Sequence, residues 1–111
     1  QVELYDLDAK DTMREKIDAA DILVNGTLLG MKPKEDTTVI SDTTMFHEGL
    51  VVADVVYNPE ETRFLREAKE HGCIRVPGKG MLLWQGVASF KLFTGKDMPV
   101  DEVKERFFQG V

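Results

Sequence analysis

The apolar positions of the chain fall into two kinds of segment, short dense runs and longer stretches with helical spacing. Dense runs predict β-strands over residues 2–5, 22–24, 50–56 and 73–76. Apolar residues three or four positions apart predict helices over 9–20, from 58 to 72, over 81–93 and from 99 onward. A short helical turn is expected around 42–46. This alternation of strands and helices predicts an α/β fold with a mostly parallel sheet and flanking helices.

The ends of the helices carry their own signals. Asp8 is the expected N-cap of the first helix, whose buried stripe would be Met13, Ile17 and Ala20. The run 58–61 has the cap, proline and acidic residues typical of a helix start. The helix that follows it would bury Phe64, Leu65 and Ala68 and end at Gly72.

The later part of the chain is more apolar. Residues 50–56 are apolar at every position except Asp54, which is typical of a central strand covered on both faces. Residues 81–93 are apolar almost all round, so we expect a helix buried on most sides and ended by Gly95. In the last helix, Val103 and Phe107 are expected to face inward.

Length, charge and apolar content limit the functions that the chain can have. The chain has 111 residues, with 14 Lys+Arg against 20 Asp+Glu and a formal net charge of −6. A length near 110 suits one domain over 1–111. The acidic balance argues against nucleic-acid binding, since phosphate recognition needs a cationic surface. No apolar run approaches the length of a membrane span, so we expect a cytoplasmic protein without membrane partners.

The sequence gives little support for a nucleophilic catalytic site or a metal site. His47 and His71 are the only histidines and Cys73 is the only cysteine. His71 precedes a helix-ending glycine, where a cation is favourable, and Cys73 lies in a predicted strand and is expected to pack there. We therefore expect no catalytic triad and no metal site.

The best candidates lie where predicted strands end. Ligands of open α/β sheets bind beyond the carboxyl ends of the strands, and these ends carry 25–27, 57–58 and 78–81. Gly78 and Gly80 stand between a strand and a helix, as in loops that bind phosphate, but the third glycine of a dinucleotide fingerprint is replaced by Leu83. By spacing alone, a tight turn that lets the helix approach the sheet is the favoured explanation of the two glycines. Gln85 is a polar residue in a helix expected to be buried, so it needs a hydrogen-bond partner, either a backbone carbonyl or a ligand.

Taken together, these segments resemble the shikimate dehydrogenase family. The matching motifs are NGTLLGMKP at 25–33, DVVYNP at 54–59, GKGMLLWQG at 78–86 and FKLFTG at 90–95. Trp84 and the run 94–97 are closer to the quinate/shikimate dehydrogenase branch. The resemblance covers essentially the whole chain and implies the distal part of a Rossmann-like NAD(P)-binding domain.

The resemblance also implies roles for individual residues. Val55 and Gly78 would lie against the nicotinamide end of NADP or NAD, Met81 beside them, and Asn58 beside the cofactor. A bulky residue at Gly78 is therefore expected to block the nicotinamide.

The substrate side of the implied site has two candidates. Tyr57 would border the cleft, and Gln85 would hydrogen-bond a hydroxyl of shikimate or 3-dehydroshikimate, or of quinate. The family's reaction is the reversible reduction of 3-dehydroshikimate to shikimate with NAD(P)H, a step toward the aromatic amino acids.

Other parts of the family's machinery do not match this chain. The glycine-rich cofactor loop, the substrate domain and its catalytic Lys and Asp have no counterpart in it, so no catalytic residue is assigned. The chain also begins at Gln1 directly before a predicted strand. We therefore expect a fragment of the parent enzyme that is inactive by itself.

Two other functions stay open at this stage. The chain could be a stand-alone α/β binding module without catalysis, or an assembly module that forms a homo-oligomer. In the second case the free edge of strand 22–24 would be covered by another copy, because open strand edges pair readily. Residues 2–5 moved inward could cover the same edge.

Overall fold

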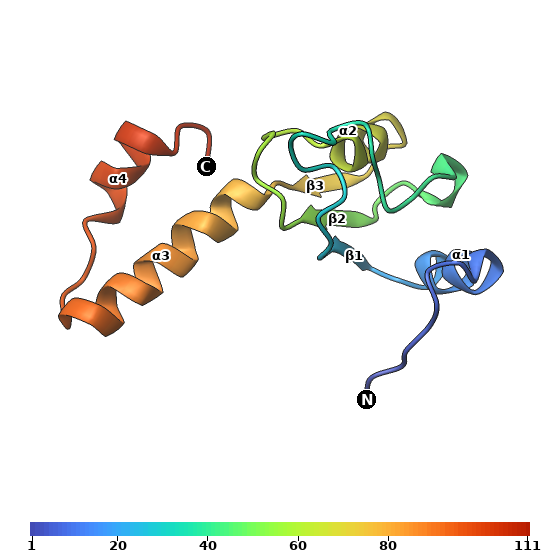
Figure 1. The fold of residues 1–111 in the computed structure, drawn as a ribbon, viewed down its shortest axis with the longest axis horizontal. Coiled ribbons are helices and arrows are strands. Elements are labelled where there is room, and N and C mark those ends of the chain that lie inside the picture. Colours follow the sequence, from blue (N-terminus) through green and yellow to red (C-terminus); the bar gives the residue numbers. More distant parts are fainter.

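The computed structural model describes residues 1–111, which form four helices, a short 3₁₀ turn and three strands (Figure 1). In chain order they are α1 (Lys10–Asp18), β1 (Ile22–Asn25), η1 (Thr43–Met45), β2 (Val51–Asp54), α2 (Arg63–Glu70), β3 (Ile74–Val76), α3 (Gly78–Thr94) and α4 (Val100–Phe107).

The three strands form one parallel sheet in the order β1-β2-β3. Asn25 pairs with Asp54, and Ala53 pairs with Val76, so the carboxyl ends of all three strands reach the same edge. The predicted α/β fold with a parallel sheet is confirmed, and β2 is the central strand that its apolar sequence indicated.

The core lies between the sheet and α2. Its centre consists of Leu50, Val52, Phe64, Leu65 and Ala68, each 1% exposed or less. The three helical residues of this set are those predicted from the sequence. The rings of Phe46 and Phe64 pack with their centroids 5.8 Å apart.

The opposite face of the sheet is open. Ile22, Val24, Ile74 and Val76 are 47–61% exposed although they are apolar. The expectation that both faces are covered is therefore wrong for the 111 residues, because no helix of the chain packs on the second face.

The start of α2 lies later than predicted. Residues 58–61 form no helix, and the Thr62 side chain caps α2 by accepting a hydrogen bond from the Leu65 amide. The Asn58–Pro59 and Lys32–Pro33 peptide bonds are cis, and the Asn58 carbonyl accepts a bond from the Lys32 amide. The signals at 58–61 thus belong to a turn that precedes the helix.

Helix α3 starts earlier than predicted and is far more exposed. It begins at Gly78 and ends before Gly95, whose φ of 70° is the left-handed conformation that favours glycine. Figure 1 shows α3 running away from the sheet, and Leu92 and Phe93 are more than 80% exposed. Burial on most sides is wrong here, because little of the chain packs against the distal half of the helix.

Helix α4 begins after Pro99, as predicted. Val103 is half-buried. Phe107 is 70% exposed, so the expected inward orientation of this ring is wrong. As with α3, an apolar side chain of the helix lies outside the core.

The N-terminal strand is absent. Residues 1–6 form no secondary structure, and Val2 and Leu4 are almost fully exposed. A strand needs a neighbour for its backbone hydrogen bonds, and this segment has none, so it does not cover the free edge of β1 either.

The predicted Asp8 cap is also wrong, since Ala9 occupies the cap position of α1. Ile17 is buried, and Met13 and Ala20 pack against the core as predicted.

Candidate functional site

The three segments that follow the strands meet at the carboxyl edge of the sheet. The Val55 amide donates to the Asn25 carbonyl, 3.1 Å away, which joins the ends of β1 and β2. Gly78, at the start of α3, packs against the backbone just after β2. The expected gathering of these segments on one edge is confirmed.

Gly78 allows this close packing because it has no side chain. A Cβ at this position would lie 2.6–2.8 Å from the carbonyl oxygens of Asp54, Val55 and Val56. This is closer than side-chain carbons and backbone oxygens approach one another in proteins. The contact supports the reading of the glycine turn as a close approach of helix to sheet. It also means that a bulky residue here collides with the backbone whether or not a cofactor is bound.

A buried polar network lies directly beneath this edge. Asn25, Asp54 and Thr62 are 1%, 3% and 0% exposed. The Asp54 carboxylate accepts hydrogen bonds from the Asn25 side chain at 3.1 Å, the Val56 amide at 2.9 Å and the Thr62 hydroxyl at 2.6 Å. Sequence reasoning missed this network, although Asp54 was visible as the one charge in an apolar strand.

The residues implied to meet a cofactor lie around the same edge. Val55 is half-buried, Gly78 is buried, Met81 is 51% exposed and Asn58 is exposed. Gly78 and Met81 belong to the first turn of α3, whose leading backbone N–H groups have no partner within the helix. These four positions therefore offer a partly open surface made mainly of backbone and apolar atoms.

The two residues implied to meet the substrate are more exposed. Tyr57 is 48% exposed. Gln85 is exposed too, and its side-chain amide donates to the Leu82 carbonyl of its own helix at 2.9 Å. The idea that Gln85 is a buried polar group is wrong, because this face of α3 has no covering element in the chain. The side-chain oxygen of Gln85 is available for a ligand.

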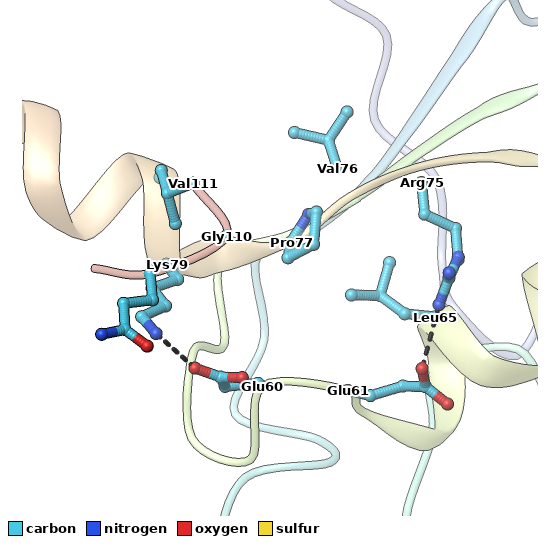
Figure 2. A pocket seen from close by; sticks show the side chains of 11 residues that line it. Glu60, Glu61, Leu65, Arg75, Val76, Pro77, Lys79, Gly110 and Val111 are labelled. Atoms are coloured by element: carbon cyan, nitrogen blue, oxygen red, sulfur yellow. Dashed lines mark hydrogen bonds and ion pairs between the residues drawn. The ribbon is translucent and has the colours of Figure 1, made fainter. Parts of the chain in front are cut away.

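A cavity lies between the start of α3, the end of β3 and the C-terminal segment. Its volume is about 590 Å³, and Figure 2 shows Glu60, Glu61, Arg75 and Lys79 on its walls with Val111 of the C-terminal segment. Lys79 pairs with Glu60 and Arg75 pairs with Glu61. None of the six implied site residues lines this cavity, and its charges are already paired.

The histidines and the cysteine have structural contacts. The His71 ring bonds the Glu67 carbonyl at 2.9 Å, and the His47 ring lies 3.2 Å from the Ile17 carbonyl. The Cys73 thiol donates to the His47 carbonyl, and desolvation raises the pKa of Cys73, which disfavours a reactive thiolate. No group of His, Cys, Asp or Glu is placed to hold a metal ion. No helix has the length and apolar character needed to cross a membrane.

Comparisons with known proteins agree with this architecture. The family model for the Shikimate 5'-dehydrogenase C-terminal domain matches residues 78–106. Among curated proteins, the quinate/shikimate dehydrogenase of Shigella flexneri is 46% identical over 100 residues, covering 90% of this chain and 40% of that protein. The enzyme of the same name from Escherichia coli is 45% identical, covering 94% of this chain and 36% of that protein.

Solved structures give the same result. Shikimate 5-dehydrogenase from Listeria monocytogenes, in complex with shikimate and NAD, superposes with a TM-score of 0.87 at 43% identity, over 93% of this chain and 36% of that one. Quinate dehydrogenase from Corynebacterium glutamicum, in complex with NAD, gives a TM-score of 0.76 at 36% identity, over 87% of this chain and 34% of that one. The chain thus spans about two fifths of the length of the curated relatives.

The parallel sheet, its carboxyl edge and the glycine at the start of α3 define the distal part of a Rossmann-like nucleotide-binding domain. The similarity extends over nearly the whole chain and to several independent relatives. Over the portion that it spans, the chain is similar in sequence and structure to members of the shikimate dehydrogenase family.

Proposed function

We propose that the chain is the C-terminal part of the NAD(P)-binding domain of a shikimate or quinate/shikimate dehydrogenase. The observation that carries this proposal is the meeting of three family motifs, those that begin at Asn25, Asp54 and Gly78, at one sheet edge, with Gly78 seated against the end of β2. The complete enzyme would interconvert 3-dehydroshikimate and shikimate, with NAD or NADP as hydride carrier. Relatives crystallised with NAD and with NADP support both nucleotides as candidates.

The chain's own residues would bind and orient rather than react. Val55, Gly78 and Met81 would provide a surface for the nicotinamide end of the cofactor, with Asn58 beside it. Tyr57 would border the substrate, and the free amide oxygen of Gln85 would accept a bond from a substrate hydroxyl. The catalytic Lys and Asp, the substrate domain and the glycine-rich loop would lie in other parts of the enzyme. A cytoplasmic location stays a prediction from composition.

A nucleotide titration of the 111-residue chain tests the binding surface. In ¹H–¹⁵N spectra, NAD or NADP is expected to shift the amide signals of Val55, Asn58, Gly78 and Met81 with weak affinity, because the pyrophosphate loop is absent. The amide signals of Asp42 and Thr44, on the η1 turn outside the site, are the internal control. Shifts spread evenly over the chain, or confined to the cavity near Arg75, would contradict the assignment.

The free edge of β1 favours a second candidate, an assembly module. β1 pairs only with β2, so its other edge offers unpaired backbone groups to a second copy. Static light scattering would then show a dimer that Val24→Lys disrupts. Val24 is 56% exposed and suits this test, whereas a charge at Leu23 would disturb the core against which that residue packs. A monomer at all concentrations would exclude the assembly module.

A further inference from the structure

Asp54 is a buried carboxylate without a cationic partner. It is 3% exposed, and none of the ion pairs in the structure involves it. Its oxygens are held only by an amide N–H, a side-chain amide and a hydroxyl. Burying a carboxylate is costly, and hydrogen bonds from neutral donors offset that cost. An apolar residue would suit an ordinary central strand better, so the presence of a carboxylate at this position indicates a role beyond packing.

The network around Asp54 joins three separate segments. Asn25 holds the loop after β1, since its side-chain oxygen accepts bonds from the amide and hydroxyl of Thr27 at 3.1 and 2.7 Å. Thr62 caps α2 through the Leu65 amide at 3.3 Å. Asp54 lies between them and bonds both. The loop after β1, the end of β2 and the start of α2 are therefore fixed relative to one another.

Asp54 also shapes the backbone that contacts α3. Its side chain accepts the Val56 amide two residues ahead, which curls the chain just after β2. This curl directs the carbonyls of Asp54, Val55 and Val56 toward Gly78. The position of the first turn of α3 relative to Val55 thus depends on where the carboxylate holds the Val56 amide.

We propose that Asp54 is a positioning residue for the nicotinamide end of the cofactor, acting through the Val55–Val56 backbone and Gly78. The inference rests on the proposed function, because Val55, Gly78 and Met81 form the surface that the cofactor would meet. Asp54 itself is separated from that surface by the backbone it holds.

Three donors converge on the Asp54 side chain, which accepts at both of its oxygens. An amide does not break this network cleanly, because in Asp54→Asn the oxygen can accept from Asn25 and the Val56 amide while the NH₂ group donates to the Thr62 hydroxyl, which is also an acceptor. Asp54→Ala removes all three bonds.

The test compares Asp54→Ala, Thr62→Val and Thr62→Ser in the complete dehydrogenase polypeptide. We expect Asp54→Ala and Thr62→Val to raise KM for the nucleotide at least roughly tenfold, the size of effect given by one lost buried hydrogen bond. Assays are run well below the melting temperature of each variant, so that only folded enzyme is compared. Thr62→Ser keeps the hydroxyl and is expected to retain the parent's nucleotide KM.

Two controls separate this role from a general effect on stability. Asp42→Ala removes a carboxylate that also accepts from a threonine amide and hydroxyl, but it lies on the exposed η1 turn. It is expected to leave nucleotide KM unchanged. If Asp54→Ala lowers the melting temperature and its folded form keeps the parent's KM and kcat, Asp54 is merely structural and the proposal is overturned. A parent enzyme without shikimate or quinate turnover would instead refute the proposed function.

Discussion

Replacing Gly78 by alanine is expected to destabilise the 111-residue chain by roughly 3 kcal/mol, the upper part of the range for overpacked sites. The new Cβ would lie 2.6–2.8 Å from three backbone carbonyl oxygens. Backbone atoms cannot rotate away as a flexible side chain can, so either α3 or the end of β2 has to move. Urea unfolding followed by circular dichroism measures the change in the free energy of unfolding.

Gly86→Ala is the matched control for this substitution. Gly86 lies in the middle of the same helix, and a Cβ there meets no atom within 4 Å. Alanine is the better helix former, so this variant is expected to gain about 0.5–1 kcal/mol. Equal effects of the two substitutions would show that Gly78 is not seated against β2. If Gly78→Ala destabilises the fold, the loss of stability can itself weaken cofactor binding. Weaker binding by this variant would therefore not by itself show that the nicotinamide site is blocked.

Phe64→Ala is expected to cost about 3–5 kcal/mol, the usual range for deleting a buried aromatic ring. Phe64 is 1% exposed, and its ring packs on Phe46 in the core between α2 and the sheet. A domain of this size has only about 5–15 kcal/mol of net stability, so the variant is expected to lose a large share of it and to unfold at a clearly lower temperature. Thermal unfolding followed by circular dichroism detects this loss.

Phe93→Ala shows whether burial rather than residue type decides the outcome. Phe93 is 86% exposed on α3. Its truncation is expected to change the free energy of unfolding by less than about 0.5 kcal/mol, as is usual for exposed positions. A large loss from Phe93→Ala would mean that the distal half of α3 packs on the domain, as its apolar sequence indicated.

Several elements of the fold could be predicted from the sequence alone. The strands at 22–25, 51–54 and 74–76 and the buried face of α2 were predictable, because their apolar positions contact one another within the chain. The end of α3 was predictable too, since Gly95 adopts the left-handed conformation that a helix end requires.

The errors have a common physical cause. A strand at 2–5 and a buried helix at 81–93 are reasonable from their apolar residues, but burial needs a partner. Val2 has no neighbouring strand, and Leu92 and Phe93 have no covering element. The apolar pattern of a segment shows that the segment favours burial. Only the structure shows whether these 111 residues also provide a surface that packs against it.

The candidate site was predictable in outline but not in detail. Parallel strands bring their carboxyl ends to one edge, so the gathering of 25–27, 57–58 and 78–81 followed from strand order. The hydrogen bonds of Asp54 to Asn25 and Thr62 did not follow, because they join side chains 29 and 8 residues apart. The contact of Gly78 with three carbonyls likewise depends on the angle at which α3 meets the sheet.

The most direct test of the central claim is a dehydrogenase assay of the complete polypeptide that contains this chain. Purified enzyme is supplied with shikimate or quinate and with NAD or NADP, and formation of the reduced nucleotide is followed by absorbance. We predict turnover that requires shikimate or quinate and one of the two nucleotides. A folded polypeptide that binds neither nucleotide and reduces none with either substrate would contradict the assignment.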